Sequence, residues 1–244
     1  QIDNQRMAGV TLTNIAGLYE AQESYEAALA LYEQAATIFN QLEDRDRQGQ
    51  TLRYIGDIYN SQRRFDQALK TFQQAITIFE ATGNREWQGY IFNDMADVYD
   101  DQFQYEEALA YYSRALAIFR ETGNRRFEAS TLHLIGFVYE SQARYQEALP
   151  IYEQALALHQ AAGDTKREAI ALRDIADVHD LQGRYSAALA LYEQSLSISR
   201  RLDDRAGEAN TLNDIGDVYN HQGRYEEALA TFQQGLIISR EIGD

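Results

Sequence analysis

The sequence predicts an all-α protein, a right-handed superhelical α-solenoid built from helix-turn-helix repeats. Short blocks such as Asp57-Ile58-Tyr59 and Asp97-Val98-Tyr99 recur at a spacing of 40 residues without a change of register. The chain has 244 residues, is rich in Ala, Leu, Gln and Glu, and contains a single proline, Pro150, so its composition favours helices. Within each repeat, apolar residues recur with the 3.6-residue period of an amphipathic helix.

Six repeats follow from this register, and each one predicts two helices. With the positions of a repeat numbered from 1 to 40, positions 4, 7, 8 and 11 form the apolar stripe of a first helix, and positions 17, 20, 21, 24, 27, 28 and 31 form that of a second helix. Position 20 is Ala in all six repeats, and position 24 is always Tyr or Phe. The repeats cover residues 9–48, 49–88, 89–128, 129–168, 169–208 and 209–244, and residues 1–8 are expected to be the tail of a preceding repeat.

Short polar segments with glycine separate the predicted helices. In Gly83-Asn84-Arg85 and Gly163-Asp164-Thr165, the glycine can end one helix in the left-handed conformation, and the Asn or Asp can cap the next helix. Because a single repeat cannot bury both of its apolar faces, the core is expected to form between neighbouring repeats. The chain begins without Met and its last repeat lacks a polar capping helix, so we expect a fragment of a longer array.

The repeat pattern resembles the tetratricopeptide repeat (TPR) in a longer form, with about six residues added to the usual 34. In the third repeat, the resemblance rests on Phe92, Met95, Ala96, Tyr99, Ala108, Tyr112 and Ala115. The Trp usual at position 4 and the Pro usual at position 32 are replaced. The chain also resembles the repeats of LGN/Pins spindle-orientation scaffolds and the TPR arrays of bacterial, notably cyanobacterial, multidomain proteins. The resemblance implies a scaffold that binds proteins or peptides in a concave groove, which the first helices line through positions 2, 5, 6, 9, 12 and 13.

The formal net charge of −16, from 38 acidic and 22 basic residues, argues against nucleic acid and anionic membrane surfaces as partners. Twelve acidic residues but only two basic ones, Arg53 and Arg173, occupy the positions that the resemblance assigns to the groove. Such a groove attracts a basic segment of a partner protein. The peptide-binding residues predicted on this basis are Asp57, Asp94, Asp97, Asp174, Asp177, Asp214 and Asp217, with Arg53, Arg173, Asn93 and Asn213. The alternative is a solvated face on which Arg53–Asp57 and Arg173–Asp177 form ordinary ion pairs one turn apart.

Apolar side chains interrupt these polar positions and predict an anchor for the partner. In the fourth repeat, Leu134 and Phe137 replace polar residues, and Tyr54 and Tyr90 add aromatic rings to the same predicted surface. Exposed aromatic and aliphatic side chains within a polar groove are typical of a peptide anchor. The alternative is that Leu134 and Phe137 pack locally against neighbouring first helices.

Other functional classes have little support in the sequence. Cysteine is absent, the four histidines occupy four different repeat positions, and no P-loop or Gly-rich nucleotide motif occurs, so we predict neither an enzyme nor a cofactor or metal site. Two alternatives stay open: a structural spacer that self-associates end to end through its terminal repeats, and a divalent-cation sensor built on acids such as Asp94, Asp97, Asp100 and Asp101. No targeting segment is visible, and we expect a cytoplasmic protein.

Overall fold

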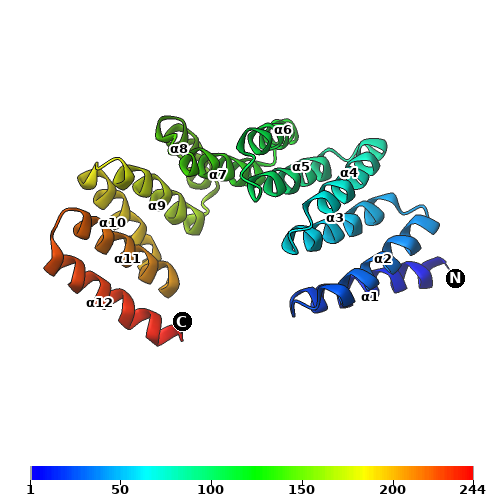
Figure 1. The fold of residues 1–244 in the computed structure, drawn as a ribbon, viewed down its shortest axis with the longest axis horizontal. Helices are drawn as coiled ribbons and strands as arrows, with labels where there is room; N and C mark the ends of the chain where they lie inside the picture. Colours follow the sequence, from blue (N-terminus) through cyan, green and yellow to red (C-terminus); the bar gives the residue numbers. More distant parts are fainter. Residues whose placement is uncertain (1, 244) are drawn as a thin grey trace. The chain divides into compact units, whose positions relative to one another are not determined.

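The computed structural model describes residues 2–243, which form α-helices joined by short turns, with no strand among them (Figure 1). The helices are α1 (Ile2–Glu20), α2 (Tyr25–Gln41), α3 (Arg45–Ser61), α4 (Phe65–Thr82), α5 (Arg85–Asp100), α6 (Tyr105–Thr122), α7 (Arg125–Ser141), α8 (Tyr145–Ala162), α9 (Thr165–Leu181), α10 (Tyr185–Arg201), α11 (Arg205–His221) and α12 (Tyr225–Ile242). Odd-numbered helices are the first helices of the repeats, and even-numbered helices are the second. The prediction of an all-α helical-repeat solenoid is confirmed.

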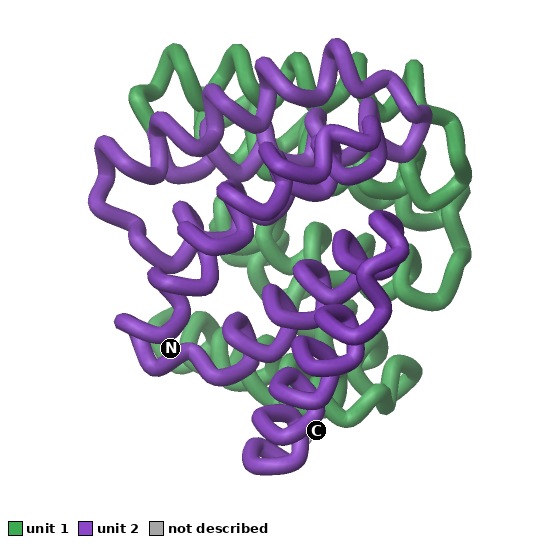
Figure 2. The backbone as a smooth tube through the Cα atoms, turned by 90° about the vertical axis from the view of Figure 1, so that its left-hand side faces the viewer, with its two compact units in different colours: residues 1–124 green, residues 125–244 purple. Residues whose placement is uncertain are grey.

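The helices belong to two compact units, residues 1–124 (unit 1) and residues 125–244 (unit 2), which Figure 2 shows in different colours. Within each unit, the two helices of a repeat pack against each other, and the second helix also packs against the first helix of the next repeat. The first helices of neighbouring repeats meet as well, α3 with α5 in unit 1 and α9 with α11 in unit 2. Each unit is therefore a stack of three helix hairpins whose core lies between them.

The core of each unit consists of the small and aromatic residues that the repeat pattern places on the inner helix faces. The alanine at position 20 is buried in every repeat, which lets the two helices of a hairpin approach closely: Ala28, Ala68, Ala108, Ala148, Ala188 and Ala228. At position 24, Phe72, Tyr112, Tyr152 and Tyr192 are among the largest fully buried or nearly buried side chains. Their rings fill the space that the small alanines leave between helices.

The predicted helix ends are found at the junctions between repeats. Gly83 and Gly163 end α4 and α8 with φ angles of 70° and 68°, in the left-handed region where glycine has no steric penalty. The Asn84 and Asp164 side chains then accept hydrogen bonds from the backbone N–H groups of Trp87 and Arg167 and so cap α5 and α9. At the start of the chain, α1 runs without a break from Ile2, so residues 2–8 extend the first helix of the first repeat.

Glycine at position 1 makes room for phenylalanine at position 31 in the first three repeats. A Cβ added to Gly49 would lie 2.6 Å from Phe79 Cζ, closer than carbon atoms can approach. The same pairing joins Gly9 to Phe39 and Gly89 to Phe119. In the last three repeats, position 1 is Ala and position 31 is His159, Ser199 or Ser239. The two positions therefore change together, because the larger residue at position 1 excludes the larger ring.

None of the helices within residues 2–243 combines the length and the apolar character that crossing a lipid bilayer requires.

Candidate functional site

Three aspartates and one arginine form a cluster on α3 and α5, which we call aspartate cluster 1: Asp57, Asp94, Asp97 and Arg53. Arg53 donates from Nε to Asp94 Oδ2 at 2.5 Å and from Nη2 to Asp94 Oδ1 at 2.9 Å. Asp94 is only 8% exposed, and this bidentate pairing is the strong geometry for a partly buried guanidinium and carboxylate. One arginine thus serves three carboxyl groups, and Asp57 and Asp97 remain as the excess negative groups.

Unit 2 repeats the arrangement on α9 and α11 as aspartate cluster 2: Asp174, Asp177, Asp214 and Arg173. Here Arg173 Nε lies 2.9 Å from Asp214 Oδ2. Asp174 forms a further ion pair with His133 of α7, whose Nδ1 lies 3.0 Å from Asp174 Oδ2. Both clusters share an Arg at position 5, an Asp at position 9 and an Asp at position 6 of the next repeat. The third aspartate differs: it is Asp97, at position 9 of the later repeat, in cluster 1 and Asp174, at position 6 of the earlier repeat, in cluster 2.

The ion pairs of both clusters join neighbouring repeats rather than neighbouring turns. The interpretation that Arg53 pairs with Asp57 and Arg173 with Asp177 is wrong, because each arginine reaches across to position 6 of the next first helix. Side chains of position 5 on one first helix and position 6 on the next face each other where these helices meet. The pairing distance in sequence is therefore one repeat plus one residue, and these pairs link the repeats of a stack.

Tyrosines at position 24 hold the aspartates at position 9. The Tyr112 hydroxyl donates to Asp97, and the Tyr192 hydroxyl donates to Asp177. Asp57 faces a different environment, because its own repeat carries Phe72 at position 24 and offers no hydroxyl there. The two clusters thus differ in how many of their carboxylates have a hydrogen-bond donor within the protein.

Burial raises the pKa of the cluster carboxyl groups. The pKa of Asp97 rises from 3.8 to about 7, because loss of hydration and the charge of Asp94 outweigh the hydrogen bond from Tyr112. Asp177 reaches about 7 for the same reasons, with Asp214 as its strongest acidic neighbour. Burial also raises the pKa of Asp57 well above its usual range. Asp97 and Asp177 are therefore partly protonated near neutral pH, and a nearby positive charge favours their ionised form.

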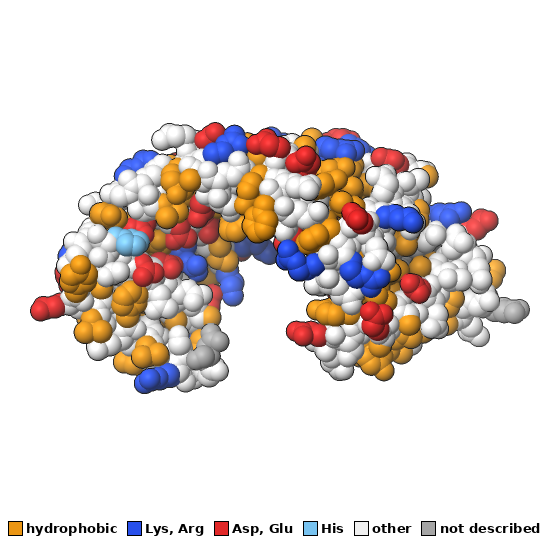
Figure 3. All heavy atoms as spheres, viewed as in Figure 1, with side chains coloured by type: hydrophobic (Ala, Val, Ile, Leu, Met, Phe, Trp, Pro, Cys, Tyr) orange, Lys and Arg blue, Asp and Glu red, His pale blue; other side chains and the backbone are white. Residues whose placement is uncertain are grey.

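Acidic and basic side chains lie side by side on the surface that Figure 3 shows, in both units, rather than forming a uniformly acidic face. Among the other predicted residues, Asp217 and Asn213 are exposed on α11, and Asn93 is buried on α5. Asp217, with Phe232 at position 24 of its repeat, is exposed, whereas Asp57, with Phe72 at that position, is partly buried. The acidic positions predicted from the sequence therefore differ widely in accessibility.

The predicted anchor residues are divided between the two units: Tyr54 and Tyr90 lie in unit 1, and Leu134 and Phe137 lie in unit 2. Tyr54 stacks on Tyr32 with ring centroids 5.4 Å apart, and a cleft beside it is lined by Asp57 and Glu20. Tyr90 packs between Trp87 and Phe119 in unit 1, with centroid distances of 5.2 and 5.4 Å. These two tyrosines are partly engaged in packing.

In unit 2, Phe137 is 49% exposed, and Leu134 is half-buried at the edge of a pocket. Of the four predicted anchor residues, Phe137 presents the most open side chain.

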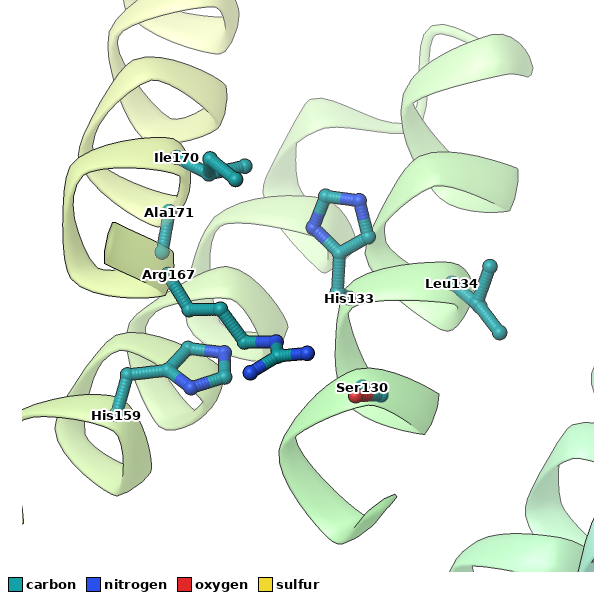
Figure 4. A pocket seen from close by; sticks show the side chains of 7 residues that line it. All are labelled: Ser130, His133, Leu134, His159, Arg167, Ile170 and Ala171. Carbon is teal, nitrogen blue, oxygen red and sulfur yellow. The ribbon is translucent and has the colours of Figure 1, made fainter. Parts of the chain in front are cut away.

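A pocket of about 240 Å³ lies between α7, α8 and α9 of unit 2, and we call it the histidine pocket (Figure 4). Its lining includes Ser130, His133, Leu134, His159, Arg167 and Ile170. A pocket of about 200 Å³ occupies the same repeat positions in unit 1, where Phe39 and Thr13 stand in place of the two histidines and Arg47 in place of Arg167. The sequence did not predict this pocket. The signal that could have found it is the change from Phe to His at position 31 together with Gly to Ala at position 1.

Within residues 2–243, no three His, Asp or Glu side chains are grouped so that they could share a metal ion.

The hairpin stacks and the polar positions along their first helices define a helical-repeat protein. The tetratricopeptide repeat model matches residues 7–81, 50–121, 87–161, 127–201 and 167–241, so the chain belongs to the tetratricopeptide repeat family. It is thereby a member of a family of protein-interaction scaffolds. No functionally curated protein matches the sequence.

Several solved structures share this fold. BtubC (BKLC) from P. vanneervenii is 17% identical, with a TM-score of 0.72 over 100% of this chain and 92% of that protein. Aspartyl phosphate phosphatase F from Bacillus subtilis is 16% identical, with a TM-score of 0.73 over 96% and 71%. A putative kinesin light chain from Podospora anserina, with nearly identical TPR-like repeats, is 18% identical, with a TM-score of 0.69 over 82% and 97%. At these identities the likeness concerns the fold alone.

Proposed function

We propose that this chain is a non-catalytic protein-binding scaffold whose first helices bind a segment rich in Lys and Arg. The observation that carries this proposal is the composition of the aspartate clusters, each with three carboxyl groups around one arginine. A lysine or arginine of the partner supplies the missing positive charge, and it lowers the raised pKa values of the carboxyl groups so that they ionise. Exposed Asp217 and Asp101 extend the attraction along α11 and α5.

Apolar contacts are the second part of the proposed interaction. Phe137 and Leu134 on α7 offer an apolar edge in unit 2, and the exposed parts of Tyr54 and Tyr90 offer aromatic contacts in unit 1. Charge attraction speeds the encounter and sets the preference for basic segments, whereas buried apolar side chains contribute most of the affinity. A Rap protein of the same fold, 15% identical to this chain, has been solved in complex with Competence and Sporulation Factor. Ligand binding is thus compatible with this architecture.

Fluorescence anisotropy with labelled peptides tests the proposal. Peptides of equal length carry four arginines, four glutamates or four glutamines between identical apolar residues. The arginine peptide is expected to bind most tightly, and raising the salt concentration is expected to weaken its binding. Asp97→Asn and Asp177→Asn each remove one titrating carboxyl group while keeping an oxygen for the tyrosine hydroxyl, so each is expected to weaken binding three- to tenfold.

The matched control is Asp66→Asn, which neutralises an exposed aspartate at the start of α4, outside both clusters. It is expected to leave binding within twofold. Because the partner's charge competes with protons at Asp97 and Asp177, binding of the arginine peptide is also expected to strengthen from pH 6 to pH 8. Equal affinities of the three peptides, or unchanged binding by both cluster variants, would exclude a role of the clusters in partner binding.

A second candidate function is self-association, which exposed apolar side chains on the terminal helices favour. Leu229 and Ile237 on α12 are 59% and 57% exposed, and Met7 and Leu18 on α1 are both 66% exposed. Sedimentation velocity over a hundredfold range of concentration measures this directly. Self-association predicts a sedimentation coefficient that rises with concentration and stays constant for Ile237→Glu. A concentration-independent monomer in the unmodified protein contradicts it.

A further inference from the structure

His159 is a buried polar residue at a position where the first three repeats have an apolar ring and the last two have serine. Its side chain is 6% exposed and lines the histidine pocket, with its ring turned towards Arg167 (Figure 4). Phe39, Phe79 and Phe119 occupy the same position in the first three repeats. Within the described part of the chain, no side chain or backbone group forms a hydrogen bond with the His159 ring. Its nitrogens are not among the fully buried polar atoms that lack a partner, so they face the open space of the pocket, where a ligand can reach them.

The polar groups that face the pocket are mainly hydrogen-bond donors. Arg167 donates from Nη1 to Asp164 at 2.5 Å, and its guanidinium extends into the pocket beside His159 (Figure 4). His133 has Nδ1 3.0 Å from Asp174, which leaves Nε2 of its ring for a ligand. None of the residues that line the pocket is Asp or Glu. The side chains available to a ligand therefore favour one that accepts hydrogen bonds.

The positive and negative charges around the pocket nearly balance. Burial lowers the pKa of His159, the charge of Asp164 opposes this shift, and the charge of Arg167 adds to it. Burial alone would lower the pKa of His133, but its ion pair with Asp174 raises it above the usual value. Since each cation is already paired with one aspartate, the site offers directed N–H groups with little excess charge. A carboxylate matches such a site better than a doubly charged phosphate.

The remaining walls are apolar and set the size of the ligand. Ile170 and Ala171 line the pocket from α9, the helix that carries Arg167, and Leu134 lines it from α7 on the other side (Figure 4). Ile170 is partly exposed. The volume of about 240 Å³ is below the ~300–1,000 Å³ of sites for drug-sized molecules, so the pocket suits a group the size of one amino-acid residue. We propose that the histidine pocket binds a carboxylate attached to a short branched aliphatic group, with Arg167 and His159 as donors to the carboxylate and Leu134 and Ile170 against the aliphatic part.

Two sources can supply this chemistry, a free small acid or the carboxyl end of a peptide with an aliphatic last residue. Isothermal titration calorimetry with 4-methylpentanoate tests the shared chemistry, and 4-methylpentanamide and 3-methylbutylamine are the neutral and cationic controls. The acid is expected to bind with a dissociation constant near or below the millimolar range, and the controls at least tenfold more weakly. The tripeptide Ala-Ala-Leu, with a free or an amidated carboxyl end, then shows whether a peptide terminus also enters.

Four variants test which side chains of the histidine pocket bind 4-methylpentanoate. Ala129→Gly together with His159→Phe recreates the Gly–Phe pair of the first three repeats and removes the imidazole, while Ala129→Gly alone keeps it. Arg167→Gln removes the guanidinium, and Arg47→Gln makes the same change in the corresponding pocket of unit 1. The double variant and Arg167→Gln are expected to weaken binding of 4-methylpentanoate at least tenfold. Ala129→Gly and Arg47→Gln are expected to leave it within twofold.

A nuclear magnetic resonance titration of His159 in the unmodified protein supplies a readout that does not depend on ligand binding by any variant. Because a bound carboxylate stabilises the charged imidazole, saturating 4-methylpentanoate is expected to raise the pKa of His159, and the resonance that shifts is the one missing from the double variant. Equal binding of the acid and the amide, unchanged binding by Arg167→Gln, or a His159 pKa that the acid does not move would each overturn the proposal. These outcomes are separate from the peptide test of the aspartate clusters, whose residues do not line the pocket, although Asp174 of cluster 2 contacts His133.

Discussion

Replacing Asp97 by Asn tests whether burial holds this carboxyl group partly protonated at neutral pH. Asp97 lies on α5, accepts a hydrogen bond from Tyr112 on α6, and has a pKa raised from 3.8 to about 7 by burial and by Asp94. Asparagine has nearly the same shape and keeps an oxygen for the tyrosine hydroxyl, but it cannot ionise. The substitution therefore removes the titration and leaves the packing in place.

The expected magnitude follows from the pKa. Between about pH 4 and pH 7, the folded protein keeps a proton on Asp97 that the unfolded chain releases, so stability falls as the pH rises through this window. A rise from 3.8 to about 7, at 1.36 kcal/mol per pKa unit, corresponds to about 4 kcal/mol. Asp97→Asn is therefore expected to differ least from the unmodified protein at pH 4.5 and to exceed its free energy of unfolding by ~2–4 kcal/mol at pH 8.

Urea unfolding followed by helical circular dichroism, repeated from pH 4.5 to pH 8.5, measures the effect. Asp66→Asn is the control, because Asp66 is exposed and its replacement is expected to shift all midpoints by the same small amount. Asp177→Asn should reproduce the result in unit 2, where Asp177 has the same tyrosine contact and a pKa of about 7. Parallel pH curves for the unmodified protein and Asp97→Asn would refute the reasoning, since they would mean that Asp97 titrates as it does in the unfolded chain.

Three further substitutions test the packing and pairing of the repeats, and urea unfolding measures each of them. Arg53→Met leaves buried Asp94 without its bidentate partner and is expected to cost ~3–5 kcal/mol at pH 8, with recovery when Asp94→Asn is added. Gly49→Ala places a Cβ 2.6 Å from the Phe79 ring and is expected to cost ~1–3 kcal/mol, whereas no loss would mean that the ring moves freely. Asp204→Ala removes the side chain that accepts from the Gly207 N–H at 3.0 Å and caps α11, at an expected cost of ~0.5–2 kcal/mol.

The helices and their ends could be predicted from the sequence because they depend on residues close together in the chain. Helical periodicity shows which face is buried, and Gly83 and Gly163 mark the left-handed helix ends that the structure contains. The same turn is harder to recognise at Arg63 and Asp203, which have φ angles of 58° and 55° without being glycine. There the packing of the flanking helices imposes the conformation, and no local residue signals it.

The partners of the acidic side chains could not be predicted from helical spacing. Arg53 has Asp57 one turn away on its own helix, and this pairing is the one that helical spacing suggests. The structure instead places Asp94 of the next repeat within 2.5 Å of the guanidinium. The choice depends on how two first helices lie against each other, which the period of 40 does not specify. Arg173 and Asp214 have the same sequence spacing as Arg53 and Asp94, one repeat plus one residue. The structure shows that this spacing brings the two side chains together across neighbouring first helices.

Departures from the repeat pattern carry the information about binding that the pattern itself lacks. The pockets of unit 1 and unit 2 occupy the same repeat positions, so their differences in chemistry come from substitutions such as Phe39 against His159. Arg47 and Arg167 are common to both pockets, and each is paired with an aspartate three residues before it. A ligand that binds both pockets must therefore depend on the arginine, whereas one that binds only in unit 2 must depend on the histidines. The unit 1 pocket is thus a reference, within the same molecule, for what His133 and His159 contribute.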